Sequence, residues 1–248
     1  MVMPDLPFAI WAGLFAVVLV SGLIRGLTGY GFALIASPLL ASMLAPVDAV
    51  KAVIMLQLGS GLIGMAPALR ECLPRPTAML VAAAVVTTPL GALVLHLIPA
   101  DTMRLTIAGL TLAALAILLW GRKRPQVHGA GFAIPFGLAA GLFGGACAIP
   151  GPPVIAYFMT IASDPRTSRA SMNVVFVAIG LVALATGLAG GLITPLSFII
   201  ALVTSPAMVI GTVIGGRLFG HIAPATYRRI GLVSLAVSAA TAAARALF

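Results

Sequence analysis

The sequence predicts an all-α integral membrane protein made of two internal repeats, each with a broken pair of helices followed by three transmembrane helices. The first observation is composition: the 248-residue chain is 61% hydrophobic and 8% charged, whereas soluble domains are about 25% charged. The second is a set of uncharged apolar runs near or above the ~18 residues typical of a membrane helix. The third is a pair of glycine- and proline-rich interruptions, residues 22–38 and 141–153, about half the chain apart.

The first half is expected to begin with a helix over residues 8–24, followed by a break at residues 26–31. A short helix over residues 32–44 comes next. Its length of about 20 Å is less than the ~30 Å apolar core of a bilayer, so we interpret it as a half-helix. Three further helices are expected, over residues 48–69, 76–97 and 101–120.

The second half repeats this plan, and its half-helix is shorter still. Its helices are expected over residues 131–148, 152–162, 166–188, 195–221 and 225–247. We therefore assign residues 1–121 to repeat 1, residues 122–129 to a basic cytoplasmic linker and residues 130–248 to repeat 2.

Matched residues support an internal duplication. Gly22 and Gly26 recur as Gly141 and Gly145, and Lys51 is matched by Arg169. Late in each half the matches keep one constant spacing. They pair Thr87, Gly91, Leu93, His96, Pro99, Ala100, Arg104 and Leu110 with Thr212, Gly216, Leu218, His221, Pro224, Ala225, Arg229 and Leu235.

The predicted topology makes the two repeats inverted relative to each other. If each broken helix pair returns the chain to the side of the membrane on which it started, the three helices that follow give each half an odd number of membrane crossings. Loop charges agree, because Arg70 and Arg75 lie in a loop whose counterpart, residues 189–195, carries no charge. Arg122, Lys123 and Arg124 mark the linker as cytoplasmic, which puts both termini outside an inner membrane. If each broken pair were one long span, the repeats would be parallel, and this alternative stays open.

The two breaks are the predicted binding site. Irregular backbone at membrane depth is tolerated where it lines a cavity or is buried in protein, and paired breaks indicate a transporter site. Helix N-termini carry unpaired N–H groups and about half a positive charge, so two of them meeting near the midplane suit a small anion. The alternative is that the glycines only allow close helix contact. The backbone site would comprise Thr28, Gly29, Tyr30, Gly31 and Phe32 with Ala148, Ile149, Pro150, Gly151 and Pro152.

A few polar side chains could complete this site. Arg25 directly precedes the first break, and an arginine inside a membrane usually marks a pathway, although it could instead snorkel to an interface. Gln57, Asn173 and Tyr157 are polar groups within apolar segments that could bind the ligand or the broken backbone. Lys51 and Arg169 follow the two half-helices and could attract anions at the two mouths or serve as interfacial anchors.

Other classes of function find less support. The net charge of +9 fits basic membrane loops rather than nucleic-acid binding. There is no catalytic motif of the HExxH or GxSxG type and no metal-ligand spacing, so we expect no enzyme activity, metal or cofactor. All five acidic residues fall at predicted helix ends or loops, so no buried carboxylate for proton or sodium coupling is visible. Expected partners are a small anion and the lipid bilayer, and a homodimer is left open.

The stretch GLIRGLTGYGFALIASPLL, from Gly22 to Leu40, resembles the sulfite exporter family TauE/SafE, also called the toluene-sulfonate uptake permease family. The degenerate stretch before Pro152 and Pro153 and the late G-x4-H-x2-P-x4-R pattern resemble it too. The resemblance covers nearly the whole chain and implies transport of sulfite, organosulfonates or other small anions, often outward. An anion channel of the same architecture and a non-transporting scaffold are the alternatives.

Overall fold

The fold is all-helical, as predicted. The computed structural model describes residues 6–120, 130–161 and 164–218, and these residues contain helices and no strand. The helices of the first half are α1 (Phe8–Thr28), α2 (Phe32–Met43), α3 (Pro46–Ile63), α4 (Met65–Glu71), α5 (Pro74–Leu97) and α6 (Ala100–Trp120). Those of the second half are η1 (Ala130–Phe132), α7 (Ala133–Cys147), α8 (Gly151–Thr160), α9 (Pro165–Ala189) and α10 (Pro195–Leu218).

Six of these helices are long and apolar enough to cross a membrane: α1, α3, α5, α6, α9 and α10. Their outward faces carry large apolar side chains that remain exposed, such as Val86 on α5 and Leu202 on α10. A soluble protein rarely exposes continuous apolar surface of this kind, whereas lipid solvates it. The chain is therefore a multi-pass membrane protein.

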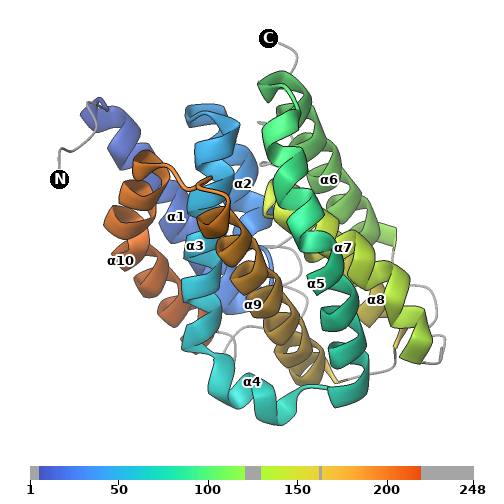
Figure 1. Ribbon diagram of the computed structural model, residues 1–248. Coiled ribbons are helices and arrows are strands. Elements are labelled where there is room, and N and C mark those ends of the chain that lie inside the picture. The colour runs from blue at the N-terminus through green and yellow to red at the C-terminus, as the bar shows by residue number, and fades with distance from the viewer. Residues whose placement is uncertain (1–5, 121–129, 162–163, 219–248) are drawn as a thin grey trace.

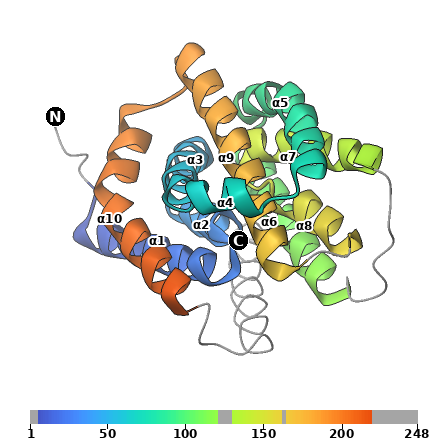
Figure 2. The same cartoon turned by 90° about the horizontal axis from the view of Figure 1, so that it is seen from below.

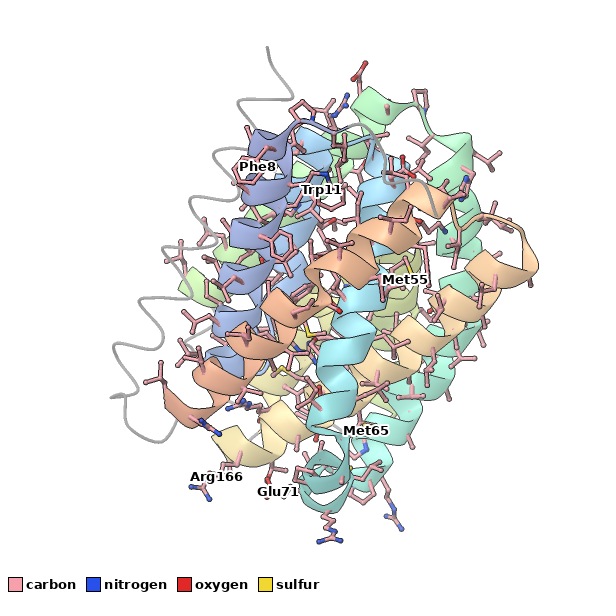
Figure 3. The ribbon with its side chains drawn as sticks, turned by 90° about the vertical axis from the view of Figure 1, so that its left-hand side faces the viewer. Phe8, Trp11, Met55, Met65, Glu71 and Arg166 are labelled. Carbon is pink, nitrogen blue, oxygen red and sulfur yellow. The ribbon has the colours of Figure 1, made fainter. Side chains whose placement is uncertain are left out.

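The two broken helix pairs enter the bundle from opposite ends. In Figure 1, α1 runs down from the upper end and α2 returns toward the start of α3, while α7 rises from the lower end and α8 returns toward the start of α9. Seen from below, α3 and α9 lie at the centre, with α1 and α10 on one side and α5 and α7 on the other (Figure 2). Figure 3 shows Phe8 near the upper end and Glu71 and Arg166 at the lower end.

Each half packs its first helix against a long helix of the other half. α1 lies along α10 and α7 lies along α5, and glycines bring the backbones together in both pairs. A Cβ atom at Gly26 would lie 2.7 Å from the Gly216 nitrogen, and one at Gly145 would lie 2.8 Å from the Ala92 nitrogen. These glycines serve helix packing, as small residues commonly do in membranes.

The packing of α10 against α1 is shifted by one residue from the pairing of residues expected late in the two repeats. A Cβ atom at Gly91 would meet the Leu142 carbonyl and the Ala146 nitrogen, and the residue making the equivalent contacts with α1 is Gly215, not Gly216. A Cβ atom at Gly216 would meet no atom of the described residues within 4 Å. The residue pairing predicted from sequence identities late in each half is therefore wrong by one residue for the described part of α10.

Two predicted boundaries are also wrong. α1 continues past the expected end at residue 24 to Thr28, because Gly22 and Gly26 are packed inside the helix pair and do not end it. The single helix expected over residues 48–69 is divided at Gly64 into α3 and α4. Pro67 explains the division, since its ring would clash with the carbonyl four residues earlier, at Ile63, in a continuous helix. The helix expected over residues 225–247 lies outside the described residues.

Candidate functional site

The two breaks share their length and the left-handed residue that ends the first helix. In each, three residues link the helices: residues 29–31 join α1 to α2, and residues 148–150 join α7 to α8. Both helices end in the left-handed conformation, at Gly29 with φ 78° and at Ala148 with φ 58°. The cap N–H groups donate to Arg25 O at 2.7 Å and to Gly144 O at 3.1 Å. Ala148 has the one positive φ outside glycine among the described residues.

The half-helix N-termini converge on a small internal cavity of about 10 Å³. Phe176, on its wall, lies near the middle of the 25-residue α9, so the cavity lies at mid-depth in the bundle. The volume is at the lower limit for one water molecule, so the cavity as it stands has no room for an oxyanion. The central cavity is lined by Arg25, Gly31, Ala33, Leu34, Gln57, Ile149, Pro150, Gly151 and Phe176.

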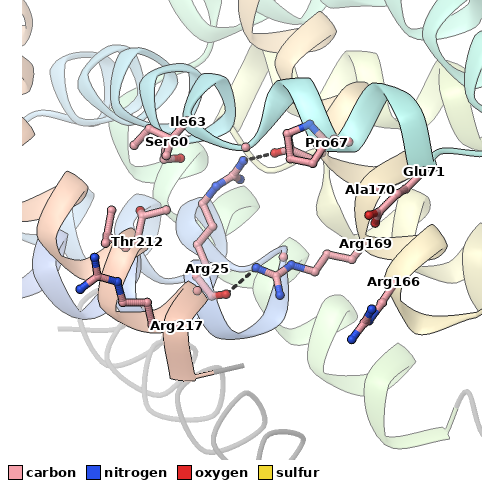
Figure 4. Close-up of a pocket in the computed structure, with 17 residues that line it drawn as sticks. Arg25, Ser60, Ile63, Pro67, Glu71, Arg166, Arg169, Ala170, Thr212 and Arg217 are labelled. Carbon is pink, nitrogen blue, oxygen red and sulfur yellow. Dashed lines mark hydrogen bonds between the residues drawn. The ribbon is translucent and has the colours of Figure 1, made fainter. Parts of the chain in front are cut away.

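A larger pocket, the lower vestibule, lies below this cavity. Its volume is about 500 Å³, and residues of α1, α3, α4, α9 and α10 line it (Figure 4). Exposed Glu71 and Arg166 lie at its rim, whereas Arg25 at its inner end is only 4% exposed. The lining comprises Arg25, Gly26, Gly29, Ser60, Ile63, Gly64, Pro67, Ala68, Glu71, Arg166, Arg169, Ala170, Asn173, Thr212, Val213, Gly216 and Arg217.

Arg25 separates the two spaces, because its side chain lines both. Its Nη2 donates to Asn173 Oδ1 at 2.6 Å, and Asn173 Nδ2 in turn donates to Gly61 O at 3.0 Å. This chain of hydrogen bonds ties α1 to α9 and α3, and Figure 4 shows the bond made by Arg25. A buried guanidinium in a membrane is costly unless it is paired or serves a pathway. The amide oxygen of Asn173 binds it without neutralising its charge.

The electrostatics of the lower vestibule favour anions. Four arginines line it, against one carboxylate, Glu71. A cleft with such an excess of one sign raises the local concentration of ions of the other sign. Arg169 has a structural bond as well, because its Nη2 donates to Gly26 O at 2.5 Å. That carbonyl lies in the last turn of α1, where no intrahelical partner is available.

The structure brings together many of the residues that the sequence singled out. Arg25 lines both spaces. Gly31, Gln57, Ile149, Pro150 and Gly151 line the central cavity. Gly29, Asn173 and Arg169 line the lower vestibule.

The remaining candidates line neither space. The Thr28 hydroxyl accepts from Tyr30 N at 3.2 Å and donates to Ile24 O at 2.8 Å, so it holds the break in shape. Tyr157 packs its ring against Phe136 and Phe158. The others lie outside both linings: Tyr30, Phe32, Lys51, Ala148 and Pro152.

Sequence reasoning missed several lining residues. Ser60 and Thr212 are polar positions inside apolar helices, and that signal could have identified them. Leu34 and Phe176 are apolar residues among many others, and nothing in their sequence context distinguishes them. The α4 side of the lower vestibule was missed because the helix break at Gly64 was not predicted.

The fold and these spaces together define a class of protein. Membrane-spanning helices interrupted in pairs, a cationic vestibule and an inner cavity at the interruptions are the architecture of a secondary transporter. Comparison with family profiles agrees, since the sulfite exporter TauE/SafE family matches residues 14–242. The chain belongs to this family of membrane transporters, which confirms the resemblance seen in the sequence. Comparisons with curated proteins and with solved structures found no match.

Proposed function

We propose that the protein exports a small anion, either sulfite or an organosulfonate, and binds it between the N-termini of the two half-helices. The observation that carries this proposal is Arg25, a buried cation that lines both the lower vestibule and the cavity between these N-termini. The family supports the substrate class. The guanidinium supplies a fixed positive charge, and the helix ends supply N–H donors and partial positive charge.

The proposed path begins in the lower vestibule and ends at the central cavity. An anion first meets the vestibule arginines and then reaches Arg25. Entry to the central cavity requires the half-helices to separate, because about 10 Å³ holds one water at most. This occlusion favours a carrier over an open channel. The two would be distinguished by saturable flux and counter-transport, which a carrier shows and a channel does not.

The same proposal orients the protein in the membrane with its lower end in the cytoplasm. α4, the start of α5, the start of α9 and the described end of α10 lie at this end (Figure 1). These segments contain Arg70, Arg75, Arg166, Arg169 and Arg217. By the positive-inside rule this end is cytoplasmic. The two broken pairs then form re-entrant hairpins of an inverted repeat, entered from opposite sides. An inside-negative potential favours exit of an anion by ~2.3 kcal/mol per charge per 100 mV.

The direct test is thermal stability of the purified protein with sulfite, sulfoacetate, taurine, sulfate, thiosulfate and chloride. A ligand at 100 times its Kd adds about 2.7 kcal/mol to the free energy of unfolding. We expect stabilisation by sulfite or a sulfonate that is lost in Arg25→Gln and retained in the control Arg104→Gln. Arg104 pairs with Asp101 and lines neither space. Absence of stabilisation by any anion, well into the millimolar range, would overturn the proposal.

A further inference from the structure

Lys51 is a buried cation without a hydrogen-bond partner. It lies in the apolar helix α3 and is 3% exposed, and its Nζ makes no hydrogen bond within the part of the chain that the structure describes. The Nζ atom points toward α9, where it lies 3.7 Å from the place of a Cβ atom at Gly187. The groups near it are few. His96 on α5 interacts with it electrostatically, and Asp48, one turn earlier on α3, accepts a hydrogen bond from Thr194.

The matched residue of the second half has the opposite environment. Arg169 lines the lower vestibule and donates to Gly26 O. The next residues differ in the same direction, since Ala170 lines the lower vestibule and is 6% exposed, whereas its match, Ala52, is 0% exposed. The helices after the two half-helices thus share a basic residue followed by alanine, but the pair on α9 lies at an open pocket whereas the pair on α3 is buried.

We propose that Lys51 is the anion-binding residue of a second vestibule, which lies toward the upper end of the bundle and is closed in this structure. This inference rests on the proposed function and adds a binding residue for the opposite side of the membrane. In transporters built from inverted repeats, one repeat rocks against the other around a fixed central site. The two repeats then exchange conformations. After that exchange Lys51 takes the place that Arg169 has now, at an open pocket and within reach of Gly145 O, the match of Gly26 O.

The chemistry at Lys51 supports an anionic ligand. An ammonium group has three donors and no acceptor, and burying it unpaired is expensive. A purely structural position in an apolar helix would be filled as well by methionine. A sulfite or sulfonate group entering from the upper end would supply the missing acceptors and neutralise the charge. The nearby carboxylate of Asp48 accepts a hydrogen bond from Thr194, and among the described residues it forms no ion pair with Lys51.

The first experiment measures transport from each side of the membrane. In vesicles of both orientations, we expect Lys51→Met to raise the Km for sulfite about tenfold or more from the upper side. That is the loss expected for one hydrogen bond to a charged group. The Km from the lower side should stay within about twofold of the wild-type value, and Lys51→Arg should restore the upper-side Km. Arg169→Met should show the reverse asymmetry. Equal Km changes on both sides in Lys51→Met, or none, would overturn the inference while leaving the proposed function intact.

The second experiment needs no knowledge of the substrate. In a Cys72→Ser, Cys147→Ala background, Ala52→Cys should react with membrane-impermeant thiol reagents from the upper side. Its control, Ala170→Cys, should react from the lower side. An anionic reagent should label Ala52→Cys faster than a cationic reagent of the same size, and adding Lys51→Met should remove that preference. Failure of Ala52→Cys to react from the upper side would overturn the second vestibule even in a protein that does not carry sulfite.

Discussion

In the break between α1 and α2, the chain turns through two glycines with positive φ, Gly29 and Gly31, beside the guanidinium of Arg25. In the break between α7 and α8, it turns through Ala148 and Pro150, and Gly144 occupies the position that matches Arg25. The first linking residue is left-handed in both breaks, whereas the third is left-handed at Gly31 (φ 102°) and right-handed at Pro150 (φ −74°). Only one break supplies a charge.

This comparison distinguishes the conformation that the turn requires from the charge that ligand binding requires. Two opposed helix ends require a left-handed residue at the turn, and alanine can adopt that conformation at a cost of ~1–2 kcal/mol. A second arginine in the same small space would face the first across a cavity of about 10 Å³, and like charges so close repel strongly. One cation between two helix N-termini suits a single small anion.

The largest expected effect comes from neutralising the charge of Arg25 at the first break. In Asn173→Asp, a carboxylate replaces the amide whose oxygen lies 2.6 Å from Arg25 Nη2. The new ion pair strengthens the bond to Arg25, but a carboxylate cannot donate to Gly61 O as Asn173 Nδ2 does at 3.0 Å, so we expect a loss of about 1–3 kcal/mol of thermal stability. Anion transport should fall at least ~100-fold, equivalent to about 3 kcal/mol. The control Asn173→Ser removes the amide without adding charge and should lower stability more than transport. Transport by Asn173→Asp within about twofold of wild type would contradict the role of Arg25.

The second prediction tests whether equivalent helix pairs hold the two breaks. Gly91→Ala on α5 and Gly215→Ala on α10 both force a methyl group against the backbone of the partner helix. We expect each to cost about 1–3 kcal/mol of stability, as overpacking does. Gly216→Ala is the matched control, because its added Cβ meets no atom within 4 Å in the part of the chain that the structure describes. Thermal unfolding in detergent would measure all three. A loss in Gly216→Ala together with tolerance of Gly215→Ala would favour the register expected from sequence identities.

The pairing of α10 with α1 illustrates which features of the structure can be predicted from the sequence alone. Because apolar length is imposed by the bilayer, hydropathy placed the described helices to within a few residues, except that the segment expected over residues 48–69 is divided into α3 and α4. The breaks were found because glycine and proline mark irregular backbone wherever it occurs. The exact pairing of α10 with α1 was missed, since both Gly215 and Gly216 fit a small-residue pattern and only the partner backbone distinguishes them. The cavity wall at Phe176 was missed for a related reason: an apolar side chain beside a ligand space looks like one in the core.

A third and smaller effect should separate the two left-handed turns. Gly29→Ala places a Cβ atom at φ 78° and against the side chain of Arg169, so we expect a loss of about 1–3 kcal/mol. Ala148→Gly relieves strain at φ 58° and, against that, increases the entropy of the unfolded chain. Its stability should lie within about 1 kcal/mol of the wild-type value. Paired thermal melts would measure both, and equal losses would show that φ is not what distinguishes the two turns.

The smallest effect concerns a hydrogen bond that joins the two breaks. Ser37, on the first half-helix, donates its hydroxyl to the carbonyl of Cys147 at 2.8 Å. That carbonyl belongs to the last residue of α7, where the helix itself offers no partner. In Ser37→Ala the carbonyl is left buried and unpaired, so we expect a loss of about 0.5–1.5 kcal/mol, in line with hydrogen bonds between membrane helices. Ser205→Ala is the control, since its hydroxyl donates to Leu202 O within its own exposed turn.

If the half-helices separate to admit an anion, the hydrogen bond from Ser37 to the Cys147 carbonyl must break in the process. Ser37→Ala should therefore leave the transport rate unchanged or raise it while stability falls, and a rate that falls in proportion to stability would contradict that separation.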